Sequence, residues 1–119
     1  MWLFQLAQDE LVRRAVVSTT DGLVIEAAGT EGPSPEFLAA EIAAIRRAFS
    51  GLEGELGEGT QRFVVTLDKH ELLVVCAGEF CVGALIKKRA GPGRRRVGEE
   101  ITRVASRIAK ELGAGGGGA

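Results

Sequence analysis

Apolar and polar residues alternate along this chain with two different periods, and the change of period divides it into eight segments. Apolar residues recur every three or four positions in three segments, which is typical of amphipathic helices. Between them lie five runs rich in Val, Ile and Leu, with the length and composition of β-strands. The expected helices are 2–11, 35–53 and 97–112, and the expected strands are 14–20, 23–28, 62–67, 71–77 and 80–87.

Turn and cap residues support these bounds. Asp21-Gly22 lies between two β-branched runs and predicts a hairpin with a type I′ turn, in which both central residues have positive φ. Gly78-Glu79 has the Gly-X order of a type II′ turn. Ser34-Pro35 suits the N-cap and first position of the middle helix, and Gly113 suits the C-cap of the last helix.

The order of the segments predicts one α+β domain, α-β-β-α-β-β-β-α, with a five-stranded antiparallel sheet. The strand at 71–77 is almost continuously apolar, so both of its faces should be covered. We therefore expect the middle helix on one face of the sheet and the terminal helices on the other. The domain should span 1–113, and the glycine-rich residues 114–119 should form a disordered tail.

The middle helix carries small side chains beside its apolar stripe. A helical wheel places Leu38, Ile42, Ile45, Phe49 and Leu52 on the core face. One flank then consists of Phe37, Ala40, Ala44, Ala48 and Gly51, the other holds Ala39, Ala43, Arg46 and Ser50, and Arg47 lies opposite the core. Small residues in series allow another backbone to approach closely, with Phe37 as an anchor. Alternatively, alanine is simply the best helix former and fills the surface.

Charge is balanced overall but not along the chain. The 119 residues include 15 Lys and Arg against 16 Asp and Glu. Residues 26–58 hold seven glutamates against two arginines, a net of −5, whereas residues 87–119 hold nine basic residues against three glutamates, a net of +6. These segments are either complementary docking patches or two solvated faces.

Membrane insertion and secretion have no support in the sequence. No apolar run approaches the ~18 residues of a transmembrane helix, so no transmembrane segment is expected. The opening residues lack the basic start of a signal peptide. A cytoplasmic location is therefore the expectation.

Catalytic chemistry is also poorly supported. His70 is the only histidine and falls in the predicted turn between the third and fourth strands. No Ser/His or Cys/His constellation and no zinc-binding spacing is present in the sequence. We therefore expect no catalytic, cofactor-binding or metal site, and no enzyme activity.

The two cysteines are predicted to face each other. If Gly78-Glu79 is a two-residue turn, Cys76 lies directly opposite Cys81 as a non-hydrogen-bonded pair, with Cα atoms ~4.5 Å apart. That separation allows a disulfide. A cytoplasmic location favours two buried thiols instead.

A basic loop precedes the last helix. Arg94, Arg95 and Arg96 stand with three further basic residues at 87–89, which makes six positive charges within ten residues. The preceding Gly91-Pro92-Gly93 lacks the order of a phosphate-binding P-loop. The cluster is a solubilising loop, a docking patch for an acidic protein, or a contact with nucleic acid or anionic lipid. Because no aromatic residues are interleaved, we expect no nucleic-acid partner.

Five segments carry a family resemblance together with the element order: residues 16–18, 21–25, 38–44, 72–75 and 82–86. They resemble the Roadblock family, the dynein light-chain type, over about residues 3–112. This family includes the MglB class of bacterial regulators of small Ras-like GTPases.

The resemblance implies a homodimer in which strands 62–67 pair antiparallel and helices 35–53 lie side by side, with Phe63 and Val65 at the interface. It also implies a small Ras-like GTPase as partner, or alternatively a scaffold role without effect on GTP turnover. Independently, strand 62–67 follows a long connection and is a candidate for an unprotected edge. The short first helix and the basic loop at 91–96 depart from the family pattern, so a different partner stays open.

Overall fold

The computed structural model describes residues 1–88 and 91–113. Its elements follow the predicted order, except that the middle helix is divided. No helix in these two ranges is long and apolar enough to cross a membrane. The elements are α1 (Phe4–Gln8), β1 (Val12–Thr19), β2 (Val24–Gly29), α2 (Pro35–Ala48), α3 (Ser50–Leu56), β3 (Arg62–Thr66), β4 (His70–Ala77), β5 (Phe80–Lys87), α4 (Pro92–Ile108) and the π-helix η1 (Ala109–Gly113).

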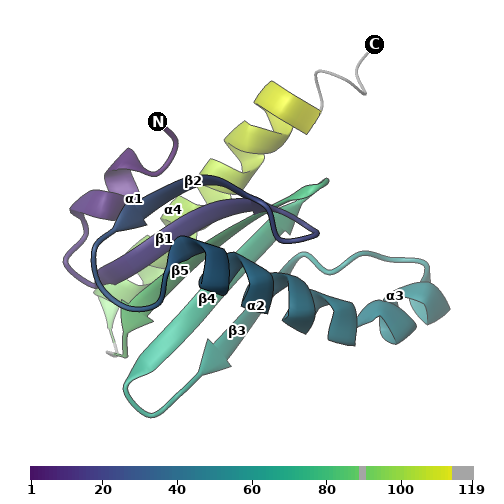
Figure 1. Cartoon of the computed structure of the whole chain (residues 1–119), viewed down its shortest axis with the longest axis horizontal. Coiled ribbons are helices and arrows are strands. Elements are labelled where there is room, and N and C mark those ends of the chain that lie inside the picture. The colour runs from purple at the N-terminus through teal and green to yellow at the C-terminus, as the bar shows by residue number, and fades with distance from the viewer. Residues whose placement is uncertain (89–90, 114–119) are drawn as a thin grey trace.

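The five strands form one antiparallel sheet in the order β2-β1-β5-β4-β3. Helix α2 lies on one face of the sheet, and α1 and α4 lie on the other (Figure 1). Buried side chains divide into two clusters accordingly. The larger cluster, beside α1 and α4, includes Leu6, Val17 and Ile101, and the smaller cluster, beneath α2, includes Leu38 and Val74. The predicted fold class and layering are confirmed.

Both terminal helices differ from their predicted bounds. Helix α1 ends at Gln8 because Asp9 is extended and its side chain accepts the N–H of Leu11 (3.0 Å), which turns the chain into β1. Helix α4 begins at Pro92, so the expected loop at 91–93 is mostly helical. Its C-terminal end widens into η1, so Gly113 lies in a π-helical turn and not at a C-cap. The predicted tail at 114–119 lies outside the described residues.

Helix α2 begins as predicted. Ser34 Oγ accepts the N–H of Phe37 (3.1 Å), and Pro35 occupies the first turn. The expected single helix to residue 53 is wrong, because the helix ends at Ala48 and Phe49 (φ −96°, ψ 2°) separates it from α3. Helix α3 has no buried residue, so the assignment of Phe49 and Leu52 to the core is also wrong. Apolar residues keep the helical period past residue 48, but the sheet does not extend beneath this part of the chain.

The first hairpin has a different turn from the one predicted. Gly22 has φ +97°, but Asp21 has negative φ, so the turn is not type I′. The N–H of Gly22 bonds to Thr19 O (3.1 Å) and the N–H of Thr19 bonds to Leu23 O (2.9 Å), which closes a three-residue loop. Thr19 Oγ1 also accepts the N–H of Leu23 (3.0 Å), which stabilises the longer loop.

The second hairpin has the predicted turn and register. Gly78 has φ +60° and Glu79 does not have positive φ, as in a type II′ turn. Ala77 pairs with Phe80, and Cys76 pairs with Cys81 with a Cα–Cα distance of 4.1 Å. The two cysteines are joined as a disulfide. The interpretation of two buried thiols is therefore wrong.

Candidate partner interface

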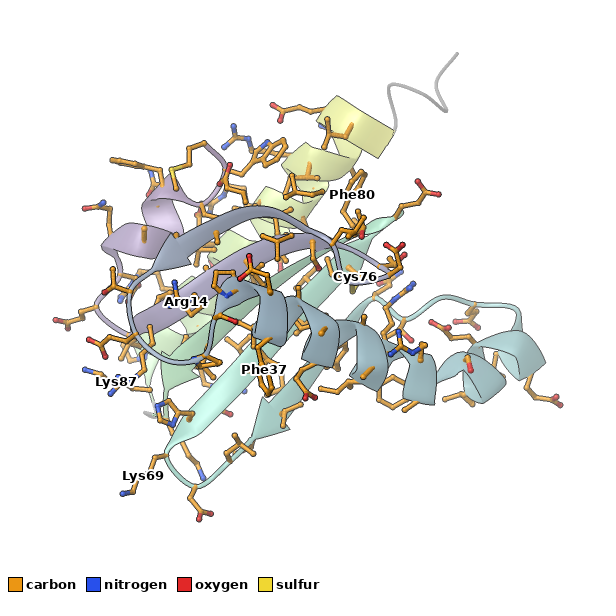
Figure 2. All side chains as sticks on the ribbon, viewed as in Figure 1. Arg14, Phe37, Lys69, Cys76, Phe80 and Lys87 are labelled. Atoms are coloured by element: carbon orange, nitrogen blue, oxygen red, sulfur yellow. A yellow bond between two sulfur atoms is a disulfide. The ribbon has the colours of Figure 1, made fainter. Side chains whose placement is uncertain are left out.

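One flank of α2 is exposed along its whole length. Phe37 exposes 57% of its surface at the start of the helix and projects below it (Figure 2). The other members of this flank, Ala40, Ala44, Ala48 and Gly51, and the neighbouring Arg47, are exposed as well. The opposite flank differs, because Ala39 and Ala43 are buried against the first hairpin. The exposed flank of α2 is therefore the flank of small side chains that the helical wheel identified.

Strand β3 is an edge of the sheet, as expected from its long preceding connection. The N–H of Cys76 bonds to Gln61 O (2.7 Å) and the N–H of Leu67 bonds to His70 O (2.8 Å). Because such bonds alternate along an antiparallel pair, Phe63 and Val65 also bond to β4, and the backbone of Arg62, Val64 and Thr66 faces outward. These outward groups are free to pair with another strand.

A groove connects the exposed flank of α2 with this edge. It has a volume of about 520 Å³. It exists because α2 contacts mainly β1 and β2, and leaves the same face of β3 and β4 partly uncovered. Its apolar lining includes Phe37, Leu38, Ile45, Val65 and Leu72, and Arg13, Glu41 and His70 are at its polar rim. Phe63 and Val65 are half-buried on this face. The helix flank, the groove and the strand edge form one continuous surface, which we name the α2–β3 surface.

Two of the three arginines in the predicted basic patch form ion pairs. Arg94 Nε donates to Glu71 Oε1 (2.7 Å), and Glu71 is buried. The bond from Arg94 lowers the pKa of Glu71 below its ordinary value, and burial opposes this shift. Arg96 Nε donates to Asp9 Oδ2 (2.8 Å) and attaches α4 to the end of α1. Only Arg95 among the three has no ion pair or hydrogen bond with the described residues.

A family model matches residues 3–86 of this sequence, and its description is the Roadblock/LC7 domain. The chain belongs to the Roadblock/LC7 family. The matched range contains the whole α2–β3 surface and all five strands except the last residue of β5. It does not contain α4, which carries the basic residues 94–96.

Solved structures share this Roadblock/LC7 fold. A Roadblock/LC7 domain from Streptomyces avermitilis is 24% identical, with a TM-score of 0.77 over 93% of this chain and 95% of that one. MglB from Myxococcus xanthus is 20% identical, with a TM-score of 0.78 over 95% and 93%. The gliding protein MglB from Thermus thermophilus is 23% identical, with a TM-score of 0.66 over 88% and 87%. No curated protein matches the sequence.

The described part of this Roadblock/LC7 domain contains no cluster of three or more His, Cys, Asp or Glu residues that could hold a metal ion. His70, expected in a turn, is the first residue of β4 and lies at the rim of the groove. Its backbone oxygen supports the turn between β3 and β4.

Helix α3 is the part of the surface that sequence reasoning missed. Leu52 and Leu56 are largely exposed and line a cavity of about 300 Å³ with Phe49 and Phe63, whose ring centroids are 6.1 Å apart. The sequence does indicate this patch. Leu52 and Leu56 are four residues apart, so they share one side of a helix, and their neighbours are glycines and glutamates. The helical wheel assigns Leu52 to the core because it assumes that the sheet continues beneath the whole helix.

Proposed function

We propose that this Roadblock/LC7 domain forms a homodimer through the α2–β3 surface, and that the dimer binds and regulates a small Ras-like GTPase without catalysing a reaction itself. The observation that carries the proposal is the continuity of three features: an exposed small-residue flank, an apolar groove and an unpaired strand edge. Each of them leaves an unsatisfied surface on the monomer, and one partner of the same shape can cover all three.

The geometry of β3 supports a two-fold arrangement. Arg62, Val64 and Thr66 face outward, so an antiparallel copy can pair with its Val64 beside this Val64. Such pairing joins the two sheets and brings the two α2 helices together on the same face. The exposed Leu52 and Leu56 of α3 extend beyond their own sheet, where they can reach a second copy. An interface of this kind is isologous, as is common in homodimers.

The paired helices then provide a platform for another protein. Arg47 is exposed on α2, opposite the core face, and remains available after the helices pair along the small-residue flank. The likeness to MglB supports a GTPase as the occupant. A stable complex of this type buries roughly 1,600 Å² in total, and a transient one buries less.

The dimer is tested by substitution on the exposed flank. Ala44→Arg places a long charged side chain between the paired helices, so the chain should become monomeric and keep its fold. Ala7→Arg is a matched control, because Ala7 is an exposed helical alanine on the other face of the sheet. The measurements are sedimentation equilibrium and far-UV circular dichroism. A wild-type chain that is monomeric at high concentration contradicts the proposal.

GTPase binding is tested with small Ras-like GTPases of the same organism loaded with GDP or a GTP analogue. We expect affinity to depend on the nucleotide, and GTP hydrolysis to change on addition of the wild-type chain. Ala44→Arg should abolish both effects, whereas Ala7→Arg should retain them. Equal affinity for the two nucleotide states with unchanged hydrolysis would leave the scaffold alternative.

A further inference from the structure

The Cys76–Cys81 disulfide lies beneath the proposed platform. It joins the ends of β4 and β5 next to the type II′ turn (Figure 2). Both cysteines belong to the buried cluster beneath α2, together with Leu38 and Ile42. Breaking this bond therefore alters the packing of the buried side chains that support α2.

The two cysteines are both buried but differ in their remaining exposure to solvent. Cys76 exposes 7% of its surface, whereas Cys81 exposes none. Cys76 also lines a surface cavity of about 540 Å³ with Thr60, Gln61 and Gly78. Residues 60 and 61 lead into β3, so this part of the cavity lies on the side of Cys76 away from Cys81. A thiolate attacks a disulfide in line with the S–S bond, and this is the side from which it must approach Cys76.

The cavity also carries positive charge. Arg46 and Arg62 line it, and Arg46 Nε is buried without a hydrogen-bond partner among the described residues. The nearest carboxylate to Arg46 is Glu53, at 4.0 Å. Arg62 donates to Thr102 of α4 (2.9 Å), on the other face of the sheet from the two cysteines, so Arg46 is the cation on the side of the disulfide. Cations next to a disulfide stabilise an approaching thiolate and favour reagents that carry further negative charge.

Cys81, the fully buried end of the disulfide, lies beside a hydroxyl group to which a free thiol can hydrogen-bond. Ser18 pairs directly with Cys81 across β1 and β5, so their side chains lie on the same face of the sheet. Ser18 Oγ is buried and has no hydrogen-bond partner among the described residues. A protonated Cys81 thiol can exchange a hydrogen bond with this hydroxyl, whereas a disulfide sulfur has no proton to donate.

We propose that Cys76 is a thiol–disulfide exchange site for an anionic thiol. The thiolate of the reagent attacks Cys76 Sγ, the Cys76–Cys81 bond breaks, and Cys81 leaves as a thiolate that takes a proton from water. Cys76 is then held in a mixed disulfide with the reagent. A second thiol molecule attacks the sulfur of the reagent, releases the Cys76 thiol, and forms the oxidised dimer of the reagent.

Exchange at Cys76 is coupled to the two elements of the α2–β3 surface, the strand β3 and the helix α2. The N–H of Cys76 donates to Gln61 O (2.7 Å), which holds the residue immediately before β3. The cysteine side chains pack with α2. Opening the bond therefore loosens the support of the edge strand and of the helix together. This consequence, unlike the exchange itself, rests on the proposed homodimer.

The exchange site is tested on the full chain purified without reductant. Titration of the unfolded protein should find no free thiol. After incubation of the folded protein with reduced glutathione and quenching with N-ethylmaleimide, peptide mass spectrometry should find glutathione on Cys76 and maleimide on Cys81. Free thiols at the start, glutathione on Cys81, or reduction only after unfolding would overturn the proposal.

The contribution of charge is tested with Arg46→Gln, and Arg46→Lys serves as the conservative variant. The glutamine variant should slow exchange with anionic glutathione by about threefold to tenfold, and slow it much less with cationic cysteamine. The lysine variant should restore the rate. Circular dichroism checks that both variants fold. Equal slowing with both thiols contradicts an electrostatic role for Arg46.

The coupling is tested by sedimentation of the oxidised and the glutathione-reduced chain. Reduction should raise the dimer dissociation constant about tenfold, because it loosens the support of the helix and of the edge strand together. The Cys76→Ser/Cys81→Ser double variant should match the reduced chain in either buffer. Equal constants in the two states overturn the coupling. A chain that is monomeric in both states overturns the proposed dimer, and the glutathione result for Cys76 still stands.

Discussion

The two faces of the sheet differ in how completely the helices cover them. On the face of α1 and α4, which we name the covered face, the two helices contact each other and lie over a large apolar cluster. On the face of α2, the open face, one helix contacts mainly β1 and β2 and leaves a groove above β3 and β4. The difference indicates that the covered face provides most of the stability of the monomer, whereas the open face leaves apolar side chains exposed.

Two ion pairs hold the elements of the covered face together. The ion pairs Arg94–Glu71 and Arg96–Asp9 attach α4 to the sheet and to α1. On the open face, large apolar side chains such as Phe37 and Leu52 are exposed. Exposed apolar side chains beside an apolar groove are typical of an interaction site.

The largest expected difference is between two isoleucine truncations. Ile101→Ala removes a fully buried side chain from the covered face and should lower the free energy of unfolding by about 3 kcal/mol. Ile45→Ala removes a half-buried side chain from the open face and should cost about 1 kcal/mol in the monomer. Urea unfolding at low protein concentration measures both. Equal losses contradict the division into a covered and an open face.

The two sides of β3 are separated by proline substitution. The N–H of Val64 faces outward, so Val64→Pro should leave the monomer folded and weaken the dimer by about tenfold or more, since proline has no N–H to donate. Val65→Pro removes a bond to β4 and should destabilise the monomer by about 3 kcal/mol. Sedimentation and urea unfolding distinguish the two effects. A dimer of normal affinity with Val64→Pro rules out pairing through β3.

Acid should weaken the covered face. The pKa of Glu71 is lowered from its ordinary value of 4.5, mainly by the bond from Arg94. The folded pKa is below the unfolded one, so the pair contributes stability above about pH 4.5, and this contribution is lost as pH falls through the folded pKa. Glu71→Gln should remove about 1 kcal/mol at pH 7, because Arg94 is partly exposed and solvent screens the pair.

The control for the acid experiment is the pH dependence itself. Urea unfolding of wild type and Glu71→Gln should converge as the pH is lowered below the folded pKa of Glu71. A difference that stays constant down to acidic pH shows that the carboxylate charge has no part in the contribution. Asp9 adds to the acid sensitivity of the wild type, because hydrogen bonds from Arg96 and Leu11 lower its pKa despite an opposing effect of burial.

The smallest expected effect concerns the start of α2. Ser34→Ala removes the acceptor for the N–H of Phe37 and should cost about 0.5–1 kcal/mol. Because Phe37 lies next to this cap, the same change should also weaken the dimer slightly. Ser34→Asp keeps an acceptor and should restore both values. Thermal unfolding and sedimentation measure the two effects.

Much of the fold was predictable from residues close together in the sequence. The cap at Ser34, the turn at Gly78-Glu79 and the pairing of Cys76 with Cys81 each depend on chemistry within a few positions. Two predictions were wrong, the first for a local reason and the second for a tertiary one. The first hairpin forms a longer loop that Thr19 stabilises, and α2 ends near Phe49, where the sheet no longer supports it.

The candidate interface was predictable in part. The helical wheel identified the exposed flank of α2, because the helical period alone decides which side chains share one side of a helix. It could not identify the groove, which depends on where α2 lies over the sheet. The ion pairs of the basic patch could not be predicted for a similar reason, since Glu71 is 23 residues from Arg94 in the sequence and the two meet only in the folded chain.

Side-chain periodicity and turn chemistry are properties of neighbouring residues, so the chain alone specifies the kind and order of its elements and which flank of α2 is small. Strand order, the open edge of β3, the groove and the ion pairs of α4 depend on how distant segments pack. Packing is decided by the total burial of the whole domain and not by any single segment, and only the folded structure records its outcome.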